Sequence, residues 1–377
     1  MLLGLILIVF IEGIAYLTGI VLNKYGIVYD PKSITENYES YADRVNLLLG
    51  WPSMTHTGHN FDLTGSRLIP EFPDPNHSSS CISMYGDSFI WGADVDNEHA
   101  WGNILAKLLN CRVANYGVGG YGTDQSYLRF HYNTHDEAKI IIIGFSSDDI
   151  RRNVNQLRNL IVPEKQFGIK PRFILSEGDK LQLVPIPNLT KKDYENLIIN
   201  PKKYLAHDYF IPGGLSGRIE MNFPFCLRVT KLSKYVFKRI INGKPGYEEF
   251  YDPDHPSEAL NVTANILKAF YQEAKIRGKY PIVLLIPIMY DIRKYQREHI
   301  WVYQTLIDKL AENNLEFLNF GNAILAYLSQ RDPQMLFTKD SHLDEEGSRV
   351  LARYVFDYLN QKNIIGGGRK ISANTPF

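Results

Sequence analysis

The sequence predicts an α/β fold in which helices cover both faces of a parallel sheet. Short apolar runs alternate with segments whose apolar residues recur at helical spacing. The run at residues 138–143 is dominated by isoleucine, as expected of a strand covered on both faces. Parallel sheets of this kind place their ligand sites beyond the carboxyl ends of the strands.

The first half of the predicted fold contains three strands and two helices. The strands are expected at residues 81–85, 111–116 and 138–143. A helix is predicted from the spacing of Trp101, Ile104, Leu105, Leu108 and Leu109, and a second helix, capped by Thr123, is predicted to run towards Tyr132.

Residues 155–255 interrupt this alternation and are predicted to form an insertion. Within it, the apolar runs on either side of Glu177-Gly178-Asp179 predict a β-hairpin at residues 171–187. Residues 23–80 are mixed in composition and rich in turn residues, and we expect a neck that lies over the domain surface.

The alternation resumes at Ser257, which is predicted to cap a helix with an apolar stripe. Strands are expected at residues 282–286 and 315–320, with a helix at 297–313 between them. The last helix is predicted to start at Asp344. The predicted domain thus covers residues 81–361, with the insertion inside it and a flexible tail at residues 362–377.

Residues 1–22 are apolar except for Glu12 and are long enough to cross a membrane. The segment has no basic region before it and no clear small-residue cleavage site, so we expect an uncleaved anchor. A hydrophobic helix packed on the soluble domain is the alternative. Glu12 is expected to face a partner helix or a polar cavity, or to be protonated in lipid. The expected partners of this segment are a lipid bilayer or a membrane protein.

The composition argues against a nucleic-acid-binding protein and against a fold held together by many disulfides. Forty-one basic residues balance 41 acidic residues, so no basic field for nucleic acid is expected. Three cysteines are too few for a disulfide framework, and Cys81 and Cys111 are expected to be small buried apolar residues. No cofactor or metal site is predicted.

Two short segments carry residue types suited to nucleophilic catalysis. Ser88 follows the first predicted strand, and His342 lies two residues after Asp340, just before the last helix. A serine hydroxyl needs a base to accept its proton, and the base needs a partner that holds its tautomer. We therefore predict a triad of Ser88, His342 and Asp340, with Asp87 supporting the turn before the serine.

A glycine-rich loop follows the second predicted strand. Residues 115–124 include four glycines, which let backbone N–H groups approach a ligand closely. Such groups can stabilise the oxyanion of an acyl-transfer reaction. The spacing also fits a dinucleotide-binding loop, but that motif belongs after the first strand and a single match is weak.

The third predicted strand ends in Ser146-Ser147-Asp148-Asp149. The two aspartates could form a metal pair, but no histidine or further carboxylate accompanies them at ligand spacing. A role at the start of a helix, near the positive end of its dipole, is the better interpretation.

With these segments in order, the chain resembles the SGNH (GDSL-type) hydrolase family over residues 81–150 and 280–360, particularly its membrane-anchored bacterial members. Gly86-Asp87-Ser88 resembles the nucleophile block, and Asp340-Ser341-His342 resembles the final block. The resemblance implies a three-layer α/β/α fold of flavodoxin-like type, with oxyanion donors from Ser88, Gly120 or Gly119, and the third block.

The third block departs from the family pattern. The family usually has Gly-x-Asn-Asp there, and Ser147 stands in the position of the asparagine, with Asp148 after it. A shorter hydroxyl is then expected to complete the oxyanion site, directly or through water.

The resemblance implies a serine esterase that acts on ester-linked acyl groups, and we expect an ester-bearing small molecule or O-acetylated glycan as substrate. An O-acyltransferase acting on a cell-surface polysaccharide is the first alternative. A weakly active or inactive subunit of a membrane complex is the second. A membrane-anchored protein with its soluble domain outside the cytoplasm, in the periplasm, is expected.

Overall fold

A five-stranded parallel sheet forms the centre of the protein, in the strand order β3-β2-β4-β8-β9. The computed structural model describes residues 2–25, 27–51, 61–73, 80–214, 219–230, 246–339 and 341–364. All five strands predicted from the sequence are present and confirm the predicted α/β class. Their bounds are Ser80–Tyr85 (β2), Arg112–Asn115 (β3), Ile140–Ser146 (β4), Tyr280–Ile286 (β8) and Phe317–Asn319 (β9).

The register places the most apolar strand at the centre of the sheet. Every residue of β4 is buried, and this strand pairs with β2 on one side and β8 on the other. Because all pairs are parallel, the carboxyl ends of the strands meet at one edge. The residues that follow β2, β3 and β4 are therefore brought close together.

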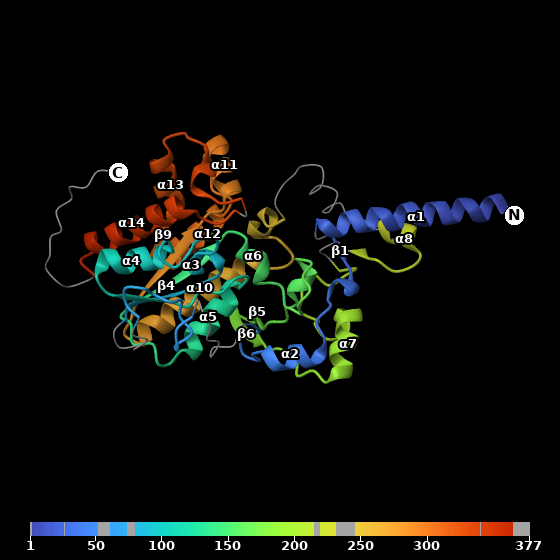
Figure 1. Cartoon of the computed structure of the whole chain (residues 1–377), viewed down its shortest axis with the longest axis horizontal. Helices are drawn as coiled ribbons and strands as arrows, with labels where there is room; N and C mark the ends of the chain where they lie inside the picture. The colour runs from blue at the N-terminus through green and yellow to red at the C-terminus, as the bar shows by residue number, and fades with distance from the viewer. Residues whose placement is uncertain are drawn as a thin grey trace.

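Helices pack on both sides of this sheet (Figure 1). On one side α4 contacts α14, which contacts α13, and on the other side α5 contacts α10. The helices named here are Trp101–Leu109 (α4), Thr123–Tyr132 (α5), Ala259–Ile276 (α10), Phe320–Leu328 (α13) and Glu345–Gln361 (α14). The predicted three-layer arrangement is thus present.

Three helix predictions need correction. Thr123 is the first residue of α5, and Gly122 precedes it as the N-cap, so Thr123 does not cap this helix. The helix expected at residues 297–313 is two helices, Met289–Glu298 (α11) and Gln304–Glu312 (α12), because His299 ends the first in a left-handed conformation with φ 56°. The residue before α10 is Glu258, whose φ is also 56°, and not Ser257. The Ser257 hydroxyl nevertheless accepts a hydrogen bond from the Ala259 N–H at 3.2 Å.

The insertion contains the predicted hairpin and a second contact with the start of the chain. Strands Arg172–Ser176 (β5) and Lys180–Val184 (β6) pair antiparallel, as predicted. Ile219–Glu220 (β7) pairs in parallel with Val28–Tyr29 (β1). The short helix Phe225–Val229 (α8) contacts the N-terminal helix. Three further helices are Tyr38–Arg44 (α2), Asp149–Arg152 (α6) and Lys191–Ile199 (α7).

The N-terminal helix α1 (Leu2–Lys24) projects away from the sheet (Figure 1). It is long and apolar enough to cross a membrane, as are many signal sequences. Few of its residues are buried against the rest of the chain: Ala15, Gly19 and Leu22. The alternative of a helix packed along the soluble domain therefore does not apply to most of its length. Residues 365–377, most of the predicted tail, lie outside the described residues.

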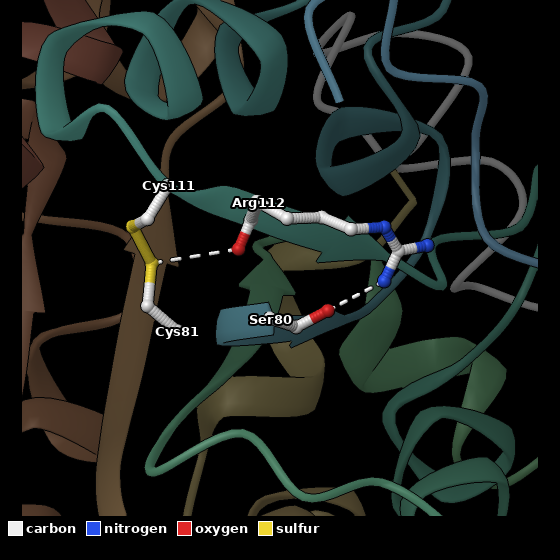
Figure 2. The surroundings of a disulfide bond; sticks show 4 residues. All are labelled: Ser80, Cys81, Cys111 and Arg112. Carbon is white, nitrogen blue, oxygen red and sulfur yellow. Dashed lines mark hydrogen bonds between the residues drawn. A yellow bond between two sulfur atoms is a disulfide. The ribbon is translucent and has the colours of Figure 1, made fainter. Parts of the chain in front are cut away.

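Cys81 and Cys111 form a disulfide, contrary to the expectation of two free buried thiols (Figure 2). Cys81 lies at an irregularity of the β2–β3 pairing, between the paired positions Ser80 and Ile82. Its side chain thereby reaches Cys111, just before β3, with a Cα–Cα distance of 6.1 Å. Cysteine counting missed this bond because it depends on strand register and not on the number of cysteines.

Candidate active site

Ser88 is the first residue of the short helix α3 (Ser88–Trp91), directly beyond the carboxyl end of β2. Asp87 precedes it as the N-cap, and its carboxylate accepts the Phe89 N–H at 2.9 Å. The Asp87 carboxylate also accepts the Ser146 hydroxyl at 2.9 Å, from the end of β4. The predicted supporting role of Asp87 therefore has a physical basis: it fixes the turn that carries Ser88 to the neighbouring strand.

The imidazole of His342 faces this serine. Nε2 of His342 lies 2.9 Å from Oγ of Ser88, across 254 residues of sequence. The ring centroids of His342 and Phe89 are 5.2 Å apart, so the residue after the serine also contacts the imidazole. The two residues that the sequence singled out are thus within hydrogen-bonding distance, as a general base and its nucleophile require.

Asp94 holds the other side of the imidazole. Its Oδ2 lies 2.8 Å from Nδ1 of His342 and accepts the Thr338 hydroxyl at 2.9 Å. Burial opposes the charge of Asp94, but the hydrogen bonds from His342 and Thr338 outweigh it and lower the pKa of Asp94. An ionised carboxylate at Nδ1 favours the tautomer with its proton on Nδ1, which leaves Nε2 free to accept the Ser88 proton.

The position predicted for Asp340 is therefore occupied by Asp94. Asp340 itself lies outside the described residues, while Ser341 adopts a left-handed conformation with φ 71°. Asp94 follows Ser88 by six residues, in the loop between α3 and α4. No spacing rule identifies it, because a carboxylate on any loop at this edge of the sheet could reach the imidazole.

The glycine-rich loop packs directly against the nucleophile helix. The Val118 N–H donates to the Gly86 carbonyl at 3.0 Å. A Cβ on Gly117 would lie 2.4 Å from the backbone nitrogen of Trp91, so only glycine permits this approach. The buried Asn115 side chain donates to the Ile90 carbonyl at 2.7 Å and accepts the Gly117 N–H at 3.0 Å. This loop is thus packed against the turn that carries Ser88, and it follows β3, which comes after β2 in the chain.

Two backbone N–H groups at this edge suit the predicted oxyanion role. Among the described residues, the N–H groups of Ser88 and Gly120 have no hydrogen-bond acceptor. Gly120 has φ 79°, a conformation that favours glycine, and its carbonyl accepts the Arg158 guanidinium at 3.2 Å. That bond restrains the peptide unit between Gly120 and Tyr121, whereas the Gly120 N–H shares its peptide unit with the Gly119 carbonyl. Gly119, the alternative, is exposed, and its carbonyl accepts the Trp51 indole N–H at 3.2 Å.

Ser147 does not provide the third predicted oxyanion donor. Its hydroxyl is buried and donates to the carboxylate of Asp291, while its carbonyl accepts the Tyr251 hydroxyl at 2.7 Å. Burial raises the pKa of Asp291 to about 6. The expectation failed because the backbone at the end of β4 turns this side chain into the protein. The local sequence does not indicate in which direction the Ser147 side chain points.

Asp148 and Asp149 begin α6, as the helix-start interpretation predicted. Arg152 donates to Asp149 at 2.8 Å and to Asp148 at 3.1 Å, and also lies 3.3 Å from Asp87. Burial opposes the charge of Asp148, but Arg151 and Arg152 outweigh it and lower the pKa of Asp148. Burial and the charge of Asp87 raise the pKa of Asp149. Arg152 therefore neutralises a carboxylate cluster directly behind the nucleophile turn.

A small pocket of about 60 Å³ adjoins the glycine loop. Its lining includes Gly120 together with the charged side chains of Asp148, Arg151, Arg152 and Arg158. The lining also contains the apolar side chains of Trp51, Ile161 and Val162, so the pocket combines charged and apolar surface. Among the described residues no group of three or more His, Cys, Asp or Glu side chains could hold a metal ion.

Comparisons with models of known protein families and with curated protein sequences found no match. Among solved structures, the chain is similar to a member of the lipolytic protein G-D-S-L family from Veillonella parvula (13% identity, 74% of this chain, 98% of that chain, TM-score 0.37). It is also similar to Axe2, an acetylxylan esterase from Geobacillus stearothermophilus (12% identity, 79% of this chain, 100% of that chain, TM-score 0.39).

Proposed function

We propose that this chain is a serine esterase that hydrolyses esters of short acyl groups, with Ser88, His342 and Asp94 as its triad. The observation that carries the proposal is the continuous line of contacts from Asp94 Oδ2 to His342 Nδ1 and from His342 Nε2 to Ser88 Oγ, each shorter than 3 Å. A serine hydroxyl in this setting can lose its proton to the imidazole as it attacks a carbonyl carbon.

The reaction follows from the position of each group. Ser88 Oγ attacks the acyl carbonyl, and its proton passes to Nε2 of His342. The N–H groups of Ser88 and Gly120 receive the oxyanion, and Asp94 stabilises the imidazolium that forms. His342 then donates the proton to the leaving alkoxide. Water, activated by the same imidazole, releases the acyl group from Ser88.

The small volume of the pocket beside Gly120, about 60 Å³, supports a short acyl group, and an O-acetylated glycan is the substrate class we propose. If a sugar hydroxyl replaces water as the acceptor, the same acyl-enzyme gives an O-acyltransferase. Incubation of the protein with an O-acetylated oligosaccharide and an unacetylated acceptor separates the two: free acetate indicates hydrolysis, and acetylated acceptor indicates transfer.

Helix α1 and the disulfide support an extracytoplasmic location for the catalytic domain, with α1 as a membrane anchor. Disulfides form and persist outside the reducing cytoplasm, and Cys81–Cys111 ties the first two strands of the domain together. Carbonate-resistant membrane fractionation and protease accessibility of the domain in spheroplasts test the anchor and the side of the membrane.

The serine is tested with a fluorophosphonate probe and p-nitrophenyl acetate. Stoichiometric labelling of Ser88, and loss of both labelling and hydrolysis in Ser88→Ala, are expected. Undiminished hydrolysis by Ser88→Ala would overturn the assignment.

The inward direction of the Ser147 side chain favours a second candidate function, a subunit of a membrane complex with little turnover. Absence of labelling in a folded protein that co-purifies with a membrane protein would support that candidate.

A further inference from the structure

Part of the insertion lies against the N-terminal helix, far from the catalytic sheet (Figure 1). We call residues 219–230 the insertion arm. Its strand β7 pairs with β1, just after the end of α1, and its helix α8 contacts α1 itself. The arm therefore runs back along the helix that is proposed to anchor the protein.

The arm is held to α1 by three kinds of contact. The carboxylate of Glu12 accepts the backbone N–H of Phe225 at 2.6 Å and that of Cys226 at 3.4 Å. The ring centroids of Phe225 and Tyr16 are 5.1 Å apart. Met221 packs over Gly19, where an added Cβ would lie 1.9 Å from Cε of Met221. These contacts cover almost two turns of α1 on one side.

The position of Glu12 fixes how deep the arm reaches. Lys24 lies twelve positions after Glu12 in the helix, which corresponds to about 18 Å along the axis. A bilayer has a hydrocarbon core of roughly 30 Å. If α1 crosses a membrane with Lys24 at one interface, Glu12 lies near the middle of the core. The part of the arm bonded to Glu12 then lies at the same depth.

The surfaces that the arm and α1 leave uncovered are apolar. Phe223 is 70% exposed and Leu227 is 57% exposed. On α1 the exposed apolar side chains follow one another around the helix and do not form a single stripe: Leu2, Leu3, Leu5, Ile6, Leu7, Ile8, Val9, Phe10, Ile11, Ile14, Tyr16, Leu17, Ile20 and Val21. A protein partner would account for one face, whereas acyl chains account for all of them.

We propose that the insertion arm enters the acyl-chain region of the bilayer beside α1, and that Glu12 is the residue that permits this. The inference rests on the proposed anchoring by α1. In the hydrocarbon core, the first N–H groups of a helix have no water to which they can donate a hydrogen bond. Burying an isolated carboxylate there also costs free energy. Here the carboxylate of Glu12 accepts two of those N–H groups, so each satisfies the other. The N–H groups at the start of α8 are thus the polar partner that we expected for Glu12 from the sequence.

Arg228 is the one charged residue of the arm after Glu220. Long basic side chains can keep their stem among apolar groups while the charge extends towards the headgroups. In the proposed position, Arg228 is therefore expected to extend its guanidinium towards the headgroups.

The test uses the full-length protein in phospholipid vesicles at several protein-to-lipid ratios. In a Cys226→Ser background the Cys81–Cys111 disulfide leaves no free thiol, so one introduced cysteine can carry an environment-sensitive NBD label. Phe223→Cys and Leu227→Cys report on the arm, and Leu7→Cys reports on α1. Ile276→Cys, at an 85% exposed position at the end of α10, is the matched water-exposed control.

Labels on Phe223→Cys and Leu227→Cys are expected to emit at shorter wavelength in vesicles, at every ratio, and to be quenched by lipids with nitroxide on the acyl chain. Iodide should quench only the Ile276→Cys label. Iodide quenching of both arm labels, with lipid quenching of Leu7→Cys, would overturn the inference and leave the anchor intact. Iodide quenching of Leu7→Cys as well would overturn the anchor. A blue shift that disappears on dilution into lipid would indicate contact with a second copy and also overturn the proposal.

Discussion

Oδ2 of Asp94 lies 2.8 Å from Nδ1 of His342, although 248 residues separate them in the sequence. The same oxygen accepts the hydroxyl of Thr338, which lies on the His342 segment. The Thr338 N–H in turn donates to the His342 carbonyl at 2.8 Å. Asp94 thus fixes the tautomer of the imidazole and also the loop that presents it to Ser88.

Replacing Asp94 by asparagine is expected to lower kcat for p-nitrophenyl acetate by roughly 10²- to 10⁴-fold. An amide that donates to Nδ1 favours the tautomer with the proton on Nε2, which cannot accept the proton of Ser88. Asp340→Asn is the matched control and is expected to change kcat far less. A larger loss in Asp340→Asn than in Asp94→Asn would return the role to Asp340.

The oxyanion assignment predicts different effects at two residues. Ser147→Ala is expected to reduce kcat/KM by well under the roughly 10²- to 10³-fold typical of a lost oxyanion donor. Gly120→Ala is expected to reach that range, because a Cβ at φ 79° would lie 2.9 Å from the Arg158 guanidinium carbon and shift the N–H. Steady-state kinetics on folded variants measure both, and a comparable loss in Ser147→Ala would restore Ser147 as a donor.

The buried carboxyl of Asp291 predicts a pH dependence of stability. Its pKa is raised from 3.8 to about 6 by burial, so the folded protein holds this proton at a pH where the unfolded chain has released it. The contribution of Asp291 to the free energy of unfolding is therefore greatest below pH 4 and falls as pH rises towards 6. The total change corresponds to about 3 kcal/mol.

Asp291→Asn keeps an oxygen that can accept the hydroxyls of Ser147 and Tyr247 but does not titrate. Urea unfolding at pH 5 and pH 7 is expected to show a smaller loss of stability on raising the pH in this variant than in the native protein. Identical pH profiles for the two proteins would contradict the assignment.

The Cys81–Cys111 bond closes a loop with a sequence separation of 30 residues. Loop closure of this length corresponds to about 3 to 4 kcal/mol of stability through the unfolded state. The double variant Cys81→Ala/Cys111→Ala should therefore unfold at lower temperature, and reductant should lower the melting temperature of the native protein but not of the variant. Cys226→Ser, the matched control, is expected to respond to reductant like the native protein.

Much of the framework follows from local patterns. Apolar runs locate all five strands of the sheet, and helical spacing locates α4, α5, α10 and α14. Ser88 and His342 were identifiable because a serine after the first strand and a histidine before the last helix both come to the carboxyl edge of a parallel sheet. The strands, the helices and these two residues are predictable because each depends mainly on residues that are close together in the sequence.

Tertiary structure alone decided which carboxylate holds the imidazole, where the Ser147 hydroxyl points, which cysteines pair and what Glu12 bonds. Each of these depends on the register of adjacent strands or on the direction of one side chain at a loop end. Asp94 and His342 meet because α14, which follows His342, packs against α4, which follows Asp94, not because of any spacing between them. Such contacts join segments far apart in the chain, and no local pattern records their geometry.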